Sequence, residues 1–268
     1  VRNIGLILLA VSLGFVFGPI IGGILSEPRI FYLFNFATPL YFAAILSAIN
    51  AFLLYIFFEE TFYKTDKVKI RIHHAINIFI SAFKHEKIWK LSVIMLIMMF
   101  GWSNYFAFIS LYMSDTYGFT VLGNSLFLAV MGLGFSIGCG YLIDLLSNRY
   151  NLRKVVSIAL IITGICIIAI FTLHNLYANW TLNLIIGASM AVAYSGIIAL
   201  FSNQVGDNEQ GWIMGVTGSI MALCFGLTTF LTGFIMIYFG VSSVLIMSFI
   251  GLIISGILLY RLKGIAAK

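Results

Sequence analysis

Long apolar runs recur along the whole 268-residue chain, and they limit its fold more than any other feature. A helix needs about 20 apolar residues to cross the hydrocarbon core of a bilayer. Of all residues, 62% are hydrophobic and 9% charged, against roughly 25% charged in an average soluble domain. The sequence therefore predicts an all-α integral membrane protein, a polytopic bundle of about eight transmembrane helices. The predicted spans cover approximately residues 4–25, 38–58, 89–112, 123–144, 155–173, 180–204, 212–237 and 241–260.

The basic residues predict how these spans are oriented. All but one of the 15 Lys and Arg residues fall in loops on one side of the predicted spans, and the exception is Arg29. Cytoplasmic loops collect Lys and Arg, so both termini and the long connection 59–88 are expected in the cytoplasm. The net charge of +6 thus reflects orientation in a lipid bilayer and does not indicate a nucleic-acid partner.

Within the connection 59–88, apolar residues recur at helical spacing, which predicts a helix lying along the membrane interface. These residues are Ile72, Ile76, Phe79 and Phe83.

The reactive residue types are arranged in a way that argues against an enzyme. The three cysteines, Cys139, Cys166 and Cys224, lie inside apolar runs, and no metal-binding spacing accompanies them. The nine acidic residues fall at the ends of spans or in loops. Carboxylates inside a membrane usually mark proton paths. The sequence therefore predicts no metal site, no cofactor and no catalytic residue, and it cannot assemble a carboxylate proton relay by itself.

The first span carries an unusual number of glycines. Gly14, Gly18 and Gly22 are four residues apart and share one helical face, where small residues let another helix approach closely. Gly23 follows them, and Pro19 is expected to bend the helix because it lacks an amide hydrogen. The pattern predicts a bent, tightly packed span, although an ordinary packing helix would also fit it.

The whole string VRNIGLILLAVSLGFVFGPIIGG resembles the signature of the fifth helix of drug:proton antiporters in the major facilitator superfamily. Further along, GYLIDLLSNRYNLRK is similar to a loop motif of that family, with Gly140, Asp144 and Arg149 retained. Leu145 stands where the motif has a basic residue. The resemblance extends over essentially the whole chain, whose spans then correspond to helices five to twelve of a twelve-helix fold.

The resemblance implies a partial major facilitator fold in three parts. Residues 1–58 would be the last two helices of the N-terminal half, 59–88 a cytoplasmic linker with its interfacial helix, and 89–268 the C-terminal six-helix half. A further N-terminal four-helix portion would be the expected partner of the chain, since the family lines its transport path with helices from both halves.

The same resemblance implies proton-coupled efflux of small drug-like molecules across the inner membrane by alternating access. The proton gradient would supply the energy without a cofactor. Asp144 and Arg149, with Gly140, would form a loop whose charge contact holds one conformation and breaks in another. The alternative is a carboxylate at a helix end beside an arginine that only sets the orientation of the span. Two alternatives remain open: an uptake carrier for a small metabolite, and a non-transporting membrane remnant or subunit that needs a partner.

Polar and aromatic residues within two spans are the candidates for a substrate cavity, because such cavities combine apolar walls with a few polar groups. The alternative is that they bridge or pack against neighbouring helices. The candidates are Trp102, Asn104 and Tyr105 in the third span, and Asn183, Ser189, Tyr194 and Ser195 in the sixth.

Overall fold

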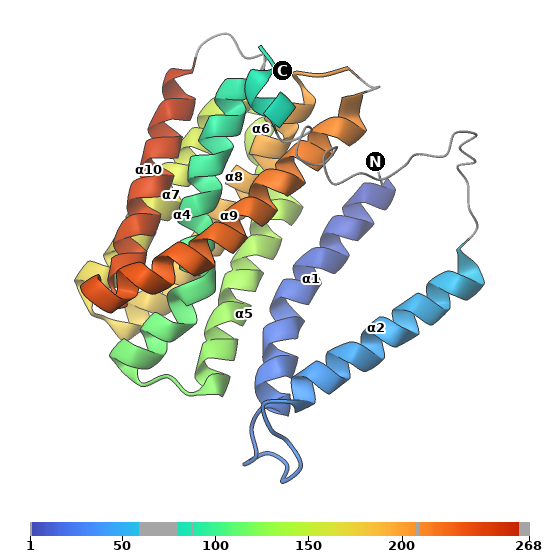
Figure 1. The fold of residues 1–268 in the computed structure, drawn as a ribbon, viewed down its shortest axis with the longest axis vertical. Helices are drawn as coiled ribbons and strands as arrows, with labels where there is room; N and C mark the ends of the chain where they lie inside the picture. Colours follow the sequence, from blue (N-terminus) through green and yellow to red (C-terminus); the bar gives the residue numbers. More distant parts are fainter. Residues whose placement is uncertain (1, 59–79, 87, 207–208, 263–268) are drawn as a thin grey trace.

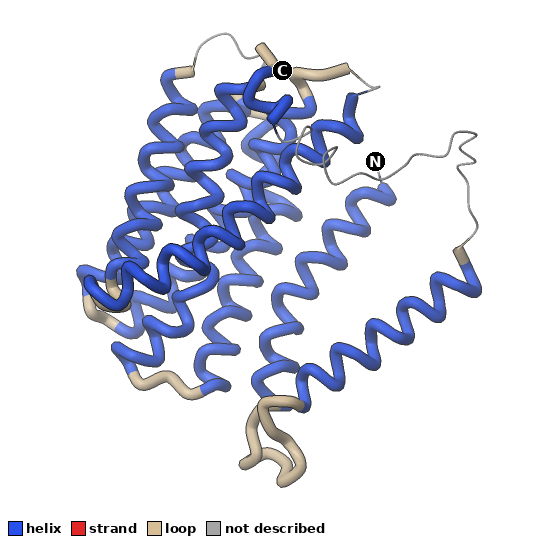
Figure 2. The backbone as a smooth tube through the Cα atoms, viewed as in Figure 1, coloured by secondary structure: helices blue, strands red, loops and turns tan. Residues whose placement is uncertain are grey.

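A computed structural model of the chain describes residues 2–58, 80–86, 88–206 and 209–262, with the side chains of the first helix from residue 13 onward. Figure 2 shows helices joined by loops throughout this part of the chain, without a strand. The helices are α1 (Arg2–Leu25), α2 (Thr38–Phe57), α4 (Trp89–Tyr117), α5 (Val121–Ile137), α6 (Ile143–Ser147), α7 (Leu152–Leu173), α8 (Leu176–Ser202), α9 (Gln210–Phe239) and α10 (Ser243–Arg261). A short π-helix, η1 (Gly138–Leu142), joins α5 to α6.

The predicted spans are confirmed as helices. Within the described ranges, seven helices of 19 to 30 residues are long and apolar enough to cross a membrane, with α5, η1 and α6 counted together as one. The remaining predicted span, 4–25, corresponds to α1, a continuous helix of 24 residues. The interfacial helix predicted within 59–88 falls mostly outside the described residues, although Phe83 lies in a helical turn and packs against the bundle core.

Capping residues explain why several helices extend beyond their predicted bounds. The side chains of Asn151 and Asn175 accept backbone hydrogen bonds at the starts of α7 and α8, which satisfies amides that have no partner within the helix. At the end of α4, Gly118 adopts a left-handed conformation (φ 67°), which favours glycine and stops the helix. These capping residues lie outside the apolar runs. A prediction from hydropathy alone therefore made these helices too short at the capped ends.

Six spans form a closely packed bundle, in which α7 contacts both α8 and α10, and α4 contacts both α9 and α10 (Figure 1). Glycines allow several of these crossings. A Cβ atom on Gly101 of α4 would lie 3.1 Å from the backbone of Leu252 in α10. On the α5–α8 crossing, a Cβ atom on Gly187 would overlap the carbonyl oxygen of Met131. Because lipid provides no hydrophobic drive between helices, such backbone contact is a main source of their association.

The first two helices are attached unequally to this bundle. α1 lies along α5 over much of its length, whereas α2 makes few contacts with α1 and has no buried residue. Figure 1 shows α2 diverging from α1 beyond the loop that joins them. The division of the chain into three parts, with boundaries at 58 and 89, remains a prediction. α1 belongs to the first part in that division, yet it packs directly on α5 of the six-span bundle.

Candidate functional site

A cavity of about 610 Å³ lies where α1, α4, α5, α8 and α9 meet. Six of the fourteen residues that line it are aromatic: Phe15, Trp102, Phe106, Phe135, Tyr194 and Phe225. Four methionines contribute much of the rest, namely Met99, Met131, Met190 and Met221. Gly132, Cys139, Ser195 and Ile198 complete the lining. No charged side chain from the described residues lines it, so the cavity offers an apolar, polarisable surface.

The aromatic rings on this wall contact one another across helices. Phe15 of α1 lies 5.2 Å from Phe135 of α5 and 6.5 Å from Phe106 of α4, measured between ring centroids. Phe106 in turn lies 5.9 Å from Trp102 and 6.0 Å from Phe225 of α9. Tilted and edge-to-face pairs at these distances are the favourable geometries for aromatic rings. The cluster therefore ties α1 to the bundle at the cavity and presents ring surfaces to its interior.

The wall has few polar side chains, and those of Cys139, Ser195 and Tyr194 hydrogen bond within it. The sulfur of Cys139 and the hydroxyl of Ser195 lie 3.3 Å apart, and Tyr194 donates its hydroxyl to the sulfur of Met221 at 3.6 Å. These contacts connect η1 to α8 and α8 to α9. A ligand in the cavity would meet mostly aromatic, aliphatic and thioether surface, with few hydrogen-bonding groups, among them the indole N–H of Trp102.

Three of the seven predicted cavity residues line this cavity: Trp102, Tyr194 and Ser195. Tyr105 and Asn183 lie behind the wall and are fully buried. Tyr105 stacks on Trp102 with ring centroids 5.9 Å apart and donates its hydroxyl to Asn183 Oδ1 at 2.8 Å. Asn183 donates from Nδ2 to the carbonyl oxygen of Phe127 at 2.6 Å. This pair links α4, α5 and α8 and holds Trp102 from behind.

The other two predicted residues, Asn104 and Ser189, bridge neighbouring helices. This is the alternative to a cavity role that the sequence left open. Asn104 Nδ2 donates to the carbonyl oxygen of Phe100 at 2.9 Å, and Thr232 of α9 donates to Asn104 Oδ1. Ser189 hydrogen bonds with Thr163 of α7 at 2.8 Å. Each polar side chain meets a partner on a neighbouring helix, so neither is available to the cavity.

We expect Tyr105→Phe to lower the stability of the bundle. The change leaves Asn183 Oδ1 buried without its donor, and a side-chain hydrogen bond between membrane helices contributes about 0.6 to 1.7 kcal/mol. The melting temperature in detergent should fall by a few degrees, about 2–4 °C per kcal/mol. Tyr177→Phe is the matched control, since Tyr177 is 86% exposed. Equal melting temperatures for both variants would contradict this bracing role.

The glycine motif of α1 packs through a different face from the predicted one. No described atom lies within 4 Å of the position that a Cβ atom would take on Gly14, Gly18 or Gly22. The buried positions of this stretch include Val16 and Gly23. They are seven residues apart and therefore lie on one face, two turns from each other. The tight packing predicted for the three-glycine face is thus not formed with any described helix.

Gly23 and Pro19 of the motif do contribute to the contact between α1 and α5. A Cβ atom on Gly23 would overlap the side chain of Ser125 in α5. Pro19 lies inside the continuous helix and cannot donate to the carbonyl of Phe15, four residues earlier. That same carbonyl lies against Gly132 of α5, where a Cβ atom would overlap it. Pro19 therefore frees a backbone oxygen where α1 lies close against α5.

The predicted loop switch lies at the end of the fourth span. Asp144 is in the first turn of α6, Arg149 follows the end of that helix, and Gly140 lies in the π-helix η1. The ion pair recorded in the described part of the chain joins Arg29 and Glu27, at 3.7 Å, and none joins Asp144 to Arg149. A charge contact between them in another conformation stays a prediction. The adjacent π-helix is a feature that often accompanies functional sites.

The cavity residues that sequence reasoning missed are the apolar ones. Several of them recur every four residues, as in Met131 and Phe135 of α5 and Cys139 of η1, or Met221 and Phe225 of α9. This spacing places them on one face. The same spacing describes any packed face of a membrane helix, so the sequence offered no signal that would have separated cavity from core.

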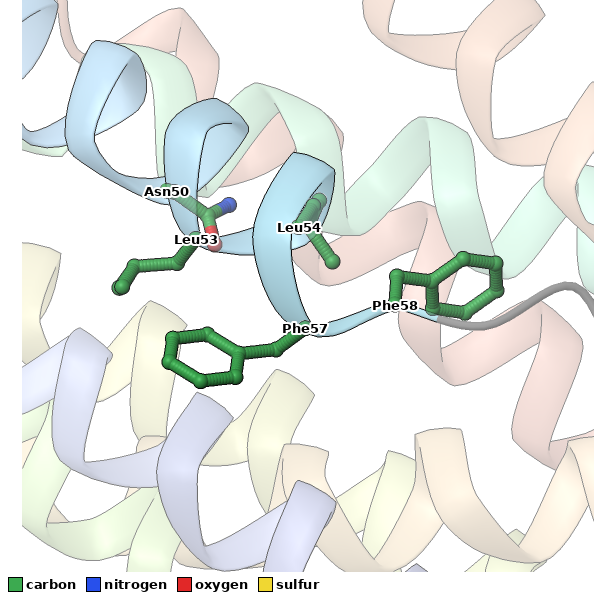
Figure 3. A pocket seen from close by; sticks show the side chains of 5 residues that line it. All are labelled: Asn50, Leu53, Leu54, Phe57 and Phe58. Carbon is green, nitrogen blue, oxygen red and sulfur yellow. The ribbon is translucent and has the colours of Figure 1, made fainter.

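A smaller depression of about 270 Å³ lies at the end of α2, lined by Asn50, Leu53, Leu54, Phe57 and Phe58 (Figure 3). These residues all belong to one helix and its end, and all are exposed. With no other described helix on its wall, this depression cannot enclose a ligand. The cavity between the five helices is therefore the candidate functional site.

Comparison with known proteins is consistent with this geometry. The chain is 22% identical over 225 residues to Multidrug resistance protein 2 of Bacillus subtilis (strain 168), covering 83% of this chain and 54% of that protein. Its fold matches the crystal structure of the human organic anion transporter MFSD10 (TETRAN) with a TM-score of 0.73 and 16% identity, over 95% of this chain and 62% of that one. The chain thus spans somewhat more than half the length of both proteins.

The family profile of the Major Facilitator Superfamily matches residues 2–221, which is most of the chain. The helices described above form part of the fold of that family. The expectation that the protein is not an enzyme is confirmed by this match. The chain belongs to the Major Facilitator Superfamily, a family of multi-pass membrane transporters.

Proposed function

We propose that this protein takes part in the efflux of small, largely apolar aromatic molecules across the cytoplasmic membrane. The observation that carries the proposal is the 610 Å³ cavity, whose wall combines six aromatic residues with four methionines and no charged side chain from the described residues. Pockets of this size and composition suit drug-sized molecules. The distant similarity to a multidrug resistance protein supports the same substrate class.

The mechanism in this proposal is alternating access. The cavity would open first to one side of the membrane and then to the other as the helix bundles rock around it. α1 meets α4 and α5 at the aromatic cluster of Phe15, Phe106 and Phe135, so rocking of α1 would change the shape of the cavity directly. The loop with Gly140, Asp144 and Arg149 would stabilise one of the two conformations.

Coupling to a proton gradient is also part of the proposal. A proton relay needs titratable groups within the membrane, and no acidic side chain from the described residues lines the cavity. The coupling carboxylates would therefore come from an additional four-helix portion, packed against α1 and α2. In this arrangement both termini of the chain face the cytoplasm, as the positions of the basic residues favour.

Vesicle transport assays test the direction and the energy source. We expect inverted membrane vesicles from cells that express the chain with such a four-helix portion to accumulate ethidium when their interior is acidified. A protonophore should abolish the accumulation. Accumulation in right-side-out vesicles instead would indicate an uptake carrier. Failure to move or bind the dye in either orientation would contradict the proposal and favour a non-transporting membrane subunit.

A further inference from the structure

The four methionines of the cavity wall come from four different helices: Met99 from α4, Met131 from α5, Met190 from α8 and Met221 from α9. Met99, Met131 and Met190 are only 1%, 4% and 1% exposed to solvent, so they are held within the bundle while still lining the cavity. A methionine side chain is unbranched, with three rotatable bonds and a polarisable sulfur. It can therefore change the outline of a cavity at low energetic cost.

Each of these methionines lies one helical turn from an aromatic residue on the same wall. Met131 precedes Phe135, Met190 precedes Tyr194, and Met221 precedes Phe225 by four residues each. In α4, Met99 precedes Trp102 by three. Residues three or four apart are neighbours on a helix surface. All four helices thus present the same combination, one rigid ring beside one adaptable thioether.

The rest of the wall gives little basis for selecting a ligand by hydrogen bonding. The polar atoms of Cys139 and Ser195 are paired with each other, and the hydroxyl of Tyr194 is directed to Met221. The indole N–H of Trp102 is one further donor on the wall. A site that selects by hydrogen bonds discriminates strongly, whereas an apolar site discriminates mainly by shape. When the wall itself can adapt, discrimination by shape is reduced as well.

We propose that Met99, Met131, Met190 and Met221 set the range of substrate shapes that the cavity accepts. The ligands would be aromatic molecules, flat or globular, whose charge is absent or delocalised. The rings supply contact area and the thioethers move to fill the space that a given ligand leaves. This inference rests on the proposed function, in which the cavity is the substrate site.

Two probes of equal charge and different shape test the inference on the full chain in lipid nanodiscs. Ethidium is flat and tetraphenylphosphonium is roughly spherical, and both carry one delocalised positive charge. The test variant replaces all four wall methionines by leucine, which has a similar volume, fewer rotatable bonds and no sulfur. The wild type should bind both probes. In the variant, the ratio of the two dissociation constants should change at least tenfold.

The chain offers a matched control with the same four-fold Met→Leu change. Met95, Met98, Met113 and Met214 lie on α4 and α9 but outside the cavity wall, the first three fully buried and the last 45% exposed. This variant should keep the wild-type ratio of dissociation constants. The four single Met→Leu variants of the wall are also measured. If the four-fold variant folds poorly, the changes that the single variants cause in the ratio of dissociation constants are added together instead.

The outcomes separate this inference from the function on which it depends. An unchanged ratio in the wall variant, or an equal change in the control variant, would overturn the role of the wall methionines while leaving the cavity as the substrate site. A wild-type chain that binds neither probe would overturn both. A shift that the wall variant alone shows would support the inference.

Discussion

Gly187→Leu should strongly destabilise the six-span bundle. In the native crossing, a Cβ atom on Gly187 of α8 would already overlap the carbonyl oxygen of Met131 in α5, and one on Gly134 would overlap that of Leu184. The obstruction is backbone on both sides, so no side-chain rotation can relieve it. Overpacking typically costs about 1–3 kcal/mol, and contact with backbone should place this substitution at or above the upper end.

The measurement is the yield and melting temperature of the chain extracted in mild detergent. A loss of about 3 kcal/mol would lower the melting temperature by about 6–12 °C, if folded protein is recovered at all. Gly18→Leu is the matched control, since nothing described lies within 4 Å of a Cβ atom there. It should insert and fold like the wild type. Similar losses in both variants would show that the close α5–α8 crossing does not determine stability.

Trp102→Leu should weaken the binding of ethidium by at least tenfold. Trp102 offers the largest ring on the cavity wall, and it is held by Tyr105 behind it and Phe106 beside it, each 5.9 Å away. Its replacement removes an aromatic stacking interaction of about 0.5–1.5 kcal/mol together with buried apolar contact area. A tenfold loss corresponds to about 1.4 kcal/mol.

Equilibrium binding to the chain in nanodiscs, followed by ethidium fluorescence, measures this effect. Trp89→Leu is the control, because Trp89 is 43% exposed at the start of α4 and lies outside the cavity. The melting temperature of each variant is recorded alongside, so that a loss of folded protein is not mistaken for a loss of affinity. Unchanged affinity in a well-folded Trp102→Leu variant would contradict the assignment of this cavity as the binding site.

Two regions of the chain illustrate what could be predicted. The string VRNIGLILLAVSLGFVFGPIIGG indicated both a membrane helix and the correct family, because the pattern of glycine and proline is local to one helix. The same string predicted that the face of the three glycines spaced by four would pack, whereas the contact with α5 uses Val16 and Gly23. A helix that is apolar on all sides has no polar face to indicate its orientation.

Asn183 and Tyr194 show the same limit in the candidate site. Both residues lie on α8 and carry a polar group, so the sequence offered no reason to prefer one over the other as a cavity residue. The structure places the Tyr194 ring on the cavity wall, whereas Asn183 hydrogen bonds to Tyr105 and to the carbonyl of Phe127. Which of the two roles a polar side chain takes depends on partners 78 and 56 residues away in the chain. Spacing within one helix contains no information about those partners.

The sequence by itself determined that the chain is a membrane-spanning bundle and where its helices lie, because the length of an apolar run and the backbone need for internal hydrogen bonds are local properties. Only the tertiary structure decided which apolar residues enclose a cavity. In a bilayer, lipid and protein interior are equally apolar, so a methionine or phenylalanine that faces lipid, core or ligand looks the same along the chain. The position of its neighbours in space is what separates the three.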